Sequence, residues 1–135
     1  MYLLDTNIVS ELRRPRPHGA VLAWLESVPD QDLHLAAVTL AEIQAGIEIT
    51  REQDTAKAAE IESWLDQVAV TYNILDTDGS VFRAWARLMH RQQDHLIEDA
   101  LIAATAQVHD LTVVTRNIAD FERFDVRIFN PFAPR

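Results

Sequence analysis

The sequence predicts an α/β protein of three layers, in which helices cover both faces of a central parallel β-sheet. Two observations support this prediction. Five short segments are apolar or β-branched, as buried strands are. Stretches at helical spacing separate these segments, and strands joined through helices pair in parallel by right-handed crossovers. The expected strands are "YLL" at 2–4, "LHLAAV" at 33–38, "YNIL" at 72–75, "TVVT" at 112–115 and "VRIF" at 126–129.

The first strand is expected to lead directly into a helix, "TNIVSEL", with Thr6 or Asn7 as its N-cap. "RRPRP" at 13–17 then breaks the helix because it contains two prolines, and it forms an exposed basic loop close in sequence to Asp5. Helical spacing returns at 18–28, and "PDQD" is a turn before the second strand.

The second strand precedes a helix that begins at Thr39, where Glu42 stands three residues later in a capping-box pattern. Further helical patterns cover 50–70, 76–92 and 97–110, and "RNIADF" predicts a turn with a short helix. There is no internal repeat, low-complexity segment or linker. We therefore expect a single domain over residues 1–135.

The composition is that of a folded globular protein, with 135 residues of which 48% are hydrophobic. The chain has no cysteine, which excludes disulfides and cysteine-based metal sites or nucleophiles. That usage fits a reducing compartment, and we expect a cytoplasmic protein. The N-terminus does not match a signal peptide, and no apolar run approaches the ~18 residues that span a bilayer, so no membrane association is expected.

The charge balance is acidic, with 12 Lys and Arg against 21 Asp and Glu and a formal net charge of -9. An acidic surface repels nucleic acid over long range and weakens non-specific binding. It does not exclude a nucleic-acid enzyme whose acidic groups are neutralised by bound metal ions. The charge therefore leaves such an enzyme open.

One carboxylate of the helix at 97–110 lies on an apolar face. Asp99 shares its stripe with Ile102, Ala103 and Ala106, whereas Glu98 shares a stripe with Thr105 and His109 that reads as solvent-facing. A buried carboxylate without partners costs several kcal/mol, so Asp99 is expected to be paired or to hold a cation. The alternative is a helix cap, because acid in a first turn is favoured by the helix dipole.

Glu42 is a second carboxylate on an apolar face of its helix. It lies over Ala45, Gly46 and Ile49, and the two small residues leave room beside it for a ligand. The competing explanation is stronger here, because a Glu three residues after Thr39 has a local role at the cap. Taken alone, the pattern favours capping.

Asp5 ends a buried strand, and its side chain is therefore expected at the edge of the sheet, as a cap or as a ligand. Asp5, Glu42 and Asp99 each stand at a strand end or a helix start, and parallel topology brings such places to one edge. Carboxylates that converge without a cation repel each other. Oxygen ligands without Cys or paired His select Mg²⁺ or Mn²⁺, which most often act on a phosphate.

Four segments together resemble the PIN-domain nucleases, and more narrowly the VapC-type toxins of bacterial type II toxin–antitoxin pairs, including the FitB-like branch. They are "LLDTNIVSEL", "TLAEIQAGI", "EDALIAATAQVHDLTVVTRNIADF" and "FNPF", and they span the chain from Tyr2 to Phe132. "DTN" alone is a weak signal, whereas four motifs in order are specific. The resemblance implies a PIN-like three-layer α/β/α sandwich with a central parallel β-sheet.

The resemblance also implies an endoribonuclease that depends on Mg²⁺ or Mn²⁺ and hydrolyses RNA phosphodiester bonds. Matched to the family motifs, the metal-binding acidic residues are Asp5, Glu42 and Asp99. The fourth family position falls on Asn117, where relatives carry Asp, and Asp120 stands one short turn later as an alternative source of charge. In the family, two residues sit against the first carboxylate and steady it; here they are Thr6 and Asn7.

The partners that the resemblance implies are RNA as substrate, a second copy of the chain in a homodimer, and a cognate antitoxin protein. DNA is then bound only indirectly, through the antitoxin. Two other classes stay open: a non-catalytic PIN-fold interaction module, which Asn117 favours, and a metal-dependent phosphatase or DNA nuclease. A haloacid-dehalogenase-type phosphatase needs a second Asp two residues after the first, and Asn7 stands there instead.

Overall fold

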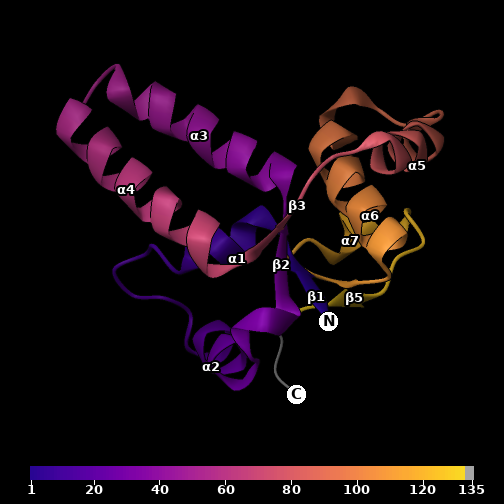
Figure 1. The fold of residues 1–135 in the computed structure, drawn as a ribbon, viewed down its shortest axis with the longest axis horizontal. Helices are drawn as coiled ribbons and strands as arrows, with labels where there is room; N and C mark the ends of the chain where they lie inside the picture. The colour runs from indigo at the N-terminus through magenta and orange to yellow at the C-terminus, as the bar shows by residue number, and fades with distance from the viewer. Residues whose placement is uncertain (133–135) are drawn as a thin grey trace.

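Five parallel strands form the single sheet of the computed structural model, which describes residues 1–132 (Figure 1). Their order across the sheet is β3-β2-β1-β4-β5, so that β1 lies in the centre with β2 on one side and β4 on the other. The predicted parallel α/β/α architecture is confirmed. The strands are β1 (Tyr2–Leu4), β2 (Leu33–Ala36), β3 (Asn73–Leu75), β4 (Thr112–Val114) and β5 (Ile128–Phe129).

The helices follow the predicted order, with ends within a few residues of those expected. They are α1 (Thr6–Glu11), α2 (Gly19–Ser27), α3 (Ala37–Arg51), α4 (Thr55–Thr71), α5 (Gly79–Met89), α6 (Ile97–His109) and α7 (Ile118–Glu122). Two short 3₁₀ turns, Asp30–Asp32 and Asp94–Leu96, precede β2 and α6. No helix within residues 1–132 has both the length and the apolar run that crossing a bilayer requires. The single domain over 1–135 stays a prediction, and its residues 133–135 lie outside the described ones.

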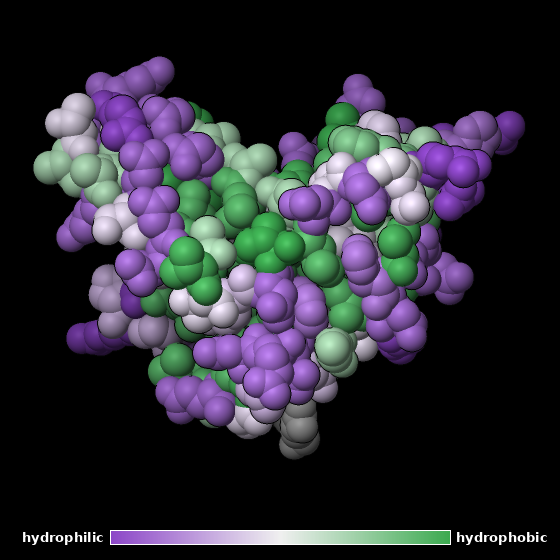
Figure 2. Space-filling model, viewed as in Figure 1, coloured by the Kyte–Doolittle hydropathy of each residue, from purple (hydrophilic) through white to green (hydrophobic). Residues whose placement is uncertain are grey.

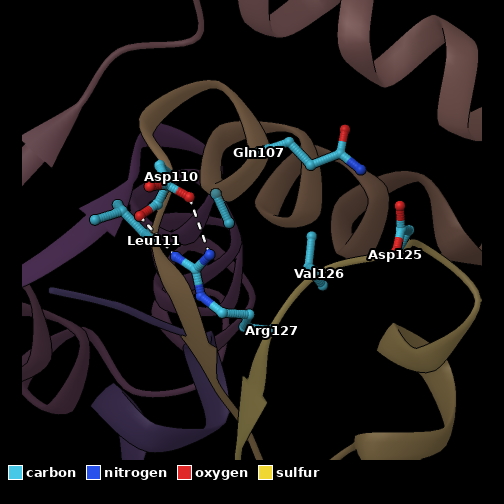
Figure 3. Close-up of a pocket in the computed structure, with 7 residues that line it drawn as sticks. Gln107, Asp110, Leu111, Asp125, Val126 and Arg127 are labelled. Carbon is cyan, nitrogen blue, oxygen red and sulfur yellow. Dashed lines mark hydrogen bonds and ion pairs between the residues drawn. The ribbon is translucent and has the colours of Figure 1, made fainter.

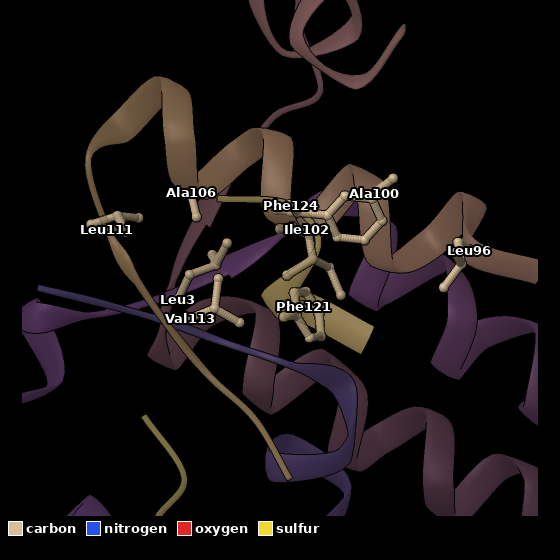
Figure 4. Close-up of a cluster of buried hydrophobic side chains, with 11 residues drawn as sticks. Leu3, Leu96, Ala100, Ile102, Ala106, Leu111, Val113, Phe121 and Phe124 are labelled. Atoms are coloured by element: carbon tan, nitrogen blue, oxygen red, sulfur yellow. The ribbon is translucent and has the colours of Figure 1, made fainter. Parts of the chain in front are cut away.

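Alternation along the strands divides the core between the two faces of the sheet, because successive side chains of a strand point in opposite directions. Leu3 and Val113 face α6 and α7, where they pack with Phe121 and other buried residues (Figure 4). Their neighbours Leu4 and Val114 belong to the opposite cluster, which α1, α2 and α4 cover. Both faces are therefore buried, as in sheets built from βαβ units.

α6 has six buried residues, more than any other helix within residues 1–132, and it corrects one detail of the sequence analysis. Thr105 is fully buried and does not lie on a solvent face. Its hydroxyl donates to the carbonyl oxygen of Leu101 at 2.8 Å, which satisfies the one group that would oppose burial. The predicted apolar stripe beside Asp99 is confirmed, since Ile102, Ala103 and Ala106 are all buried.

Two helical pairs, α3 with α4 and α5 with α6, extend beyond the sheet and diverge (Figure 1). In the same view β2 runs directly up into α3, so the carboxyl ends of the parallel strands face the notch between the pairs. Figure 2 shows hydrophobic residues at the base of this notch, below more hydrophilic arms. The notch therefore opens over the edge at which the sequence analysis places the functional residues.

The opposite edge of the sheet holds a separate cavity of about 500 Å³ (Figure 3). Arg127 closes one side of it, donating to the carboxylate of Asp110 at 3.0 Å and to its carbonyl oxygen at 2.9 Å. This clamp joins the end of α6 to the start of β5. No residue predicted for the site lines this cavity.

Candidate active site at the carboxyl ends of the strands

Asp5 both caps a helix and belongs to the pocket. Its backbone leaves β1 with a hydrogen bond to the carbonyl of Val114, and one carboxylate oxygen accepts from the N–H of Thr6 at 2.7 Å. Asp5 is therefore the N-cap of α1, and the prediction of Thr6 or Asn7 at that position is wrong. The other oxygen accepts from the side chains of Asn7 at 3.1 Å and Thr115 at 2.8 Å.

Thr115 is a site residue that the sequence analysis missed. It directly follows β4, is fully buried, and donates its hydroxyl to Asp5 while accepting from the N–H of Asn117 at 2.9 Å. One hydroxyl thus ties the loop after β4 to the carboxylate after β1. Thr115 carries the same sequence signal as Asp5, because it is a polar residue at the end of a buried strand. Threonine is not titratable, so it did not stand out.

Glu42 does not form the expected capping box. α3 begins at Ala37, immediately after β2, with Ala36 as its N-cap, so Thr39 lies inside the helix. The hydroxyl of Thr6 instead donates to Glu42 at 3.0 Å, and the hydroxyls of Thr6 and Thr39 are hydrogen-bonded to each other at 3.1 Å. Capping of α3 together with Thr39 therefore does not explain the position of Glu42. Its side chain is held by the residue that follows Asp5.

The apolar stripe beside Glu42 differs from expectation in a second respect. It is not buried: Ala45 and Gly46 are exposed, and Ile49 is 65% exposed. The expected room beside Glu42 is present, because Glu42 and Gly46 both line a groove of about 350 Å³ between α1, α3 and α4.

Asp99 lies half-buried in the first turn of α6, over the apolar residues described above. Its pKa is raised from 3.8 to about 7, first because burial disfavours the charged form and then because Asp5, Asp120 and Glu42 are negative neighbours. Burial also raises the pKa of Asp5 and of Glu42, although hydrogen bonds from Thr115 and Thr6 oppose the shift. All three carboxyls share an environment that resists negative charge.

The three carboxylates line one pocket of about 370 Å³, together with the predicted neighbours Thr6 and Asn7. Its remaining lining residues are Ser10, Arg14 and Asn117. The topology explains the convergence: Asp5 and Asn117 follow the adjacent strands β1 and β4, where the strand order reverses. Glu42 comes from the second turn of α3, and Asp99 comes from the first turn of α6.

Asn117 and Asp120, the two alternatives for the fourth position, are placed differently. Asn117 lines the pocket. Asp120 lies on α7 with its side chain 41% exposed, and its nearest ion pair is Arg123 at 3.9 Å. Asp120 still acts at a distance, because its charge contributes to the raised pKa of Asp5 and of Asp99.

The donor chemistry of the pocket fits a hard divalent cation. All the candidate ligands are carboxylate or amide oxygens, which Mg²⁺ and Mn²⁺ prefer. Within residues 1–132 no three acidic or His side chains lie close enough together to hold an ion in this conformation. Asp5 and Glu42 each accept hydrogen bonds from neighbouring side chains instead. The amide oxygen of Asn7 is buried without a partner in the described part of the chain, so the pocket also presents an unused acceptor.

Comparison with known proteins agrees with the fold and the motif order. The family model described as the PIN domain matches residues 2–127. The chain is 37% identical to Toxin FitB of Neisseria gonorrhoeae over 98% of this chain and 99% of that protein. It is 34% identical to VapC ribonuclease Y4jK of Sinorhizobium fredii, over 99% of each. A solved structure described as FitAB bound to a DNA fragment matches with a TM-score of 0.86 and 33% identity, over 100% of this chain and 98% of that one.

A parallel sheet with acidic side chains at the reversal of strand order defines the class of protein, and the family match agrees: the chain belongs to the PIN-domain family. Within that family its relatives by sequence include the proteins named Toxin FitB and VapC ribonuclease Y4jK. The resemblance inferred from the four motifs is confirmed.

Proposed function

We propose that this chain is the toxin of a toxin–antitoxin pair and an endoribonuclease that depends on Mg²⁺ or Mn²⁺. The observation behind this proposal is the pocket that Asp5, Glu42 and Asp99 line together and in which the pKa of each is raised. Buried acids that repel one another are suited to a site that a cation completes. The name of the VapC ribonuclease relative supports RNA as the substrate.

In this proposal Asp5 and Asp99 hold the main ion, and Glu42 binds it or a second one. A bound Mg²⁺ or Mn²⁺ supplies a Lewis acid that activates water and neutralises the charge developing on a phosphate. The chain's own residues fix the ligands. Thr115 and Asn7 hold one oxygen of Asp5, and Thr6 holds Glu42, as the residues around a metal site commonly do.

For the fourth position we propose Asn117, because it lines the pocket while Asp120 does not. An amide oxygen can coordinate a cation or orient water, with less attraction than a carboxylate. Asp120 then contributes charge to the surroundings of the site. Replacing Asn117 by Asp adds a fourth acid to the pocket and is expected to tighten Mg²⁺ binding.

The proposed partners are a cognate antitoxin, RNA, and a second copy of this chain. The relative solved as FitAB on a DNA fragment supports binding of DNA through the partner protein. The net charge of -9 agrees with an indirect contact, because an acidic chain is repelled by a duplex. The homodimer rests on the family resemblance, and light scattering of the purified chain tests it.

The decisive experiment is a cleavage assay with purified protein on RNA, single-stranded DNA and a phosphomonoester, with and without Mg²⁺ or Mn²⁺. We expect cleavage of RNA alone, only with metal. Asp5→Asn and Asp99→Asn are each expected to reduce kcat at least a hundredfold while the protein stays folded, and to abolish growth inhibition in cells.

Asp66→Asn is the matched control, since it removes one exposed carboxylate from α4 that lines neither the acidic pocket nor the groove beside Glu42. It is expected to cleave like the unmodified protein. Undiminished cleavage or toxicity in Asp5→Asn would remove the site assignment. If neither Mg²⁺ nor Mn²⁺ raises the Tm or supports cleavage, the protein is instead a non-catalytic interaction module.

A further inference from the structure

The basic loop after α1 sends two neighbouring arginines to different places. Arg13 lines the groove beside Glu42, with its guanidinium 5.9 Å from the ring centre of Trp64. Arg14 lines the acidic pocket itself, and it is the one basic residue among those that line it. A positive side chain at a pocket of three carboxylates is either their counter-ion or a contact for an anionic substrate.

The contacts of Arg14 exclude the counter-ion explanation. Within residues 1–132 its only ion pair is from Nε to Glu11, at 3.4 Å, and it has none with Asp5, Glu42 or Asp99. Its side chain is 64% exposed, and its two terminal nitrogens make no hydrogen bond within that part of the chain. A guanidinium held through Nε with both terminal nitrogens free is ready for bidentate binding of phosphate.

Glu11 fixes the loop that carries Arg14. It is the last residue of α1 and is only 4% exposed, although charged residues are seldom so buried. One carboxylate oxygen accepts from the backbone N–H of His18 at 2.7 Å, across the whole loop, and the other meets Arg14. One buried carboxylate therefore contacts both the middle and the far end of the loop.

The far end of the loop is fastened to the other side of the site. The ring of His18 lies 5.0 Å from that of Phe132, and the guanidinium of Arg116 lies 4.5 Å above the same ring. Arg116 stands between Thr115 and Asn117 in the segment that completes the pocket. The loop is thus anchored at Glu11 and at Phe132, and Arg14 lies between the anchors.

We propose that Arg14 binds a backbone phosphate of the RNA beside the scissile one, and that Glu11 is a positioning residue that aims it. This inference rests on the proposed function. It gives a chain of net charge -9 a local means of admitting a polyanion to an acidic pocket. It also explains why the acid Glu11 is buried, although Glu11 does not line the proposed metal site.

The test measures RNA affinity and cleavage separately. Fluorescence anisotropy of a labelled single-stranded RNA gives Kd with Ca²⁺, a hard cation of looser coordination geometry, in place of Mg²⁺. Steady-state cleavage with Mg²⁺ gives KM and kcat. Arg14→Ala is expected to weaken Kd and KM about tenfold and to change kcat less than threefold. Arg14→Lys should recover part of the loss, because it keeps the charge without the fork.

Glu11→Gln tests the positioning role, because Gln still accepts from the N–H of His18 but no longer pairs with Arg14. We expect a three- to fivefold rise in KM with Tm nearly unchanged. In the Arg14→Ala background the same substitution should leave KM unchanged, because the residue that it aims is gone. Arg83→Ala, which removes one exposed arginine from α5, is the matched control and should keep the Kd of the unmodified protein.

Two results overturn the inference: a Kd within twofold of the unmodified protein in Arg14→Ala, or an equal loss in Arg83→Ala. Additive effects of Glu11→Gln and Arg14→Ala overturn the positioning role. If the unmodified protein binds RNA through Arg14 but cleaves none with any metal, the proposed enzymatic function fails while this inference stands.

Discussion

At the scale of single residues, the charge of Asp99 opposes folding at neutral pH. The folded protein keeps the Asp99 proton up to a pKa of about 7, whereas the ordinary value is 3.8. The folded state therefore binds the proton more tightly than the unfolded chain. The stability that protonated Asp99 contributes at low pH is lost as the pH rises from about 4 to about 7, and the loss is complete above that range.

Asp99→Asn should consequently be the more stable protein in metal-free buffer at pH 8. Solvent screening in a half-open pocket reduces the effect to about 1 kcal/mol, which is about 4 °C in Tm for a domain of this size. The gain should shrink as the pH is lowered toward 4. Thermal melts in EDTA at several pH values measure it. Mg²⁺ should reverse the order, because only the unmodified site gains from the ion; a Tm lower than the unmodified protein's at pH 8 in EDTA would contradict the prediction.

Thr115 can be tested by an isosteric change. Thr115→Val removes the donor to Asp5 and the acceptor for Asn117, so Mg²⁺ affinity should fall about 10- to 100-fold. Calorimetric titration measures it. Thr112→Val, at the amino end of β4 and so at the opposite edge of the sheet, is the control, and its Mg²⁺ affinity should be unchanged. Equal affinities in both variants would show that the Thr115 hydroxyl has no part in holding the site.

At the scale of elements, the arm formed by α3 and α4 has a small core of its own. Ile47, Ala58, Ile61 and Leu65 form a cluster of their own, which is linked to one face of the sheet through Ile43 and Trp64. The polar links between these helices, such as Gln44 and Arg51 to Glu62, are on the surface and add little. The outer part of the arm therefore depends on a few apolar contacts and should open independently of the sheet.

Ile47→Ala should cost about 2–4 kcal/mol, and hydrogen exchange should accelerate in α3 and α4 while α6 stays protected. Ile49→Ala is the matched control two residues along the same helix, where the side chain is exposed, and it should change exchange little. Faster exchange in α6 after Ile47→Ala would mean that the arm and the sheet unfold together.

At the scale of the whole molecule, an acidic chain should bind RNA through few phosphates. Arg14 at the pocket and Arg116 beside Asn117 provide about two contacts, which predicts a slope of about -1.4 for log affinity against log salt. Affinity should then fall only about sevenfold between 50 and 200 mM KCl, measured by anisotropy. A slope steeper than -3 would require a broad basic surface.

The architecture could be predicted from the sequence because strands and helices differ in residue composition and in the spacing of their apolar residues. Asp5, Glu42 and Asp99 lie together because parallel topology brings the ends of strands and the first two turns of α3 and α6 to one edge. The errors are local. The capping box at Thr39 failed because α3 follows β2 without a loop, and Thr105 was misplaced because its hydroxyl bonds within its own helix. The contacts of Glu11 with His18 and Arg14 depend on the path of a loop, which spacing does not specify.

The hydrogen bond between Thr115 and Asp5 joins residues that are 110 positions apart, and this has a consequence for timing. During synthesis Asp5 leaves the ribosome early, but β4, the neighbour of β1, is made late. The pocket is thus among the last parts of the molecule to exist. A chain that terminates before Thr115, or is cut by a protease while still growing, carries its acidic residues without the arrangement that makes them a site.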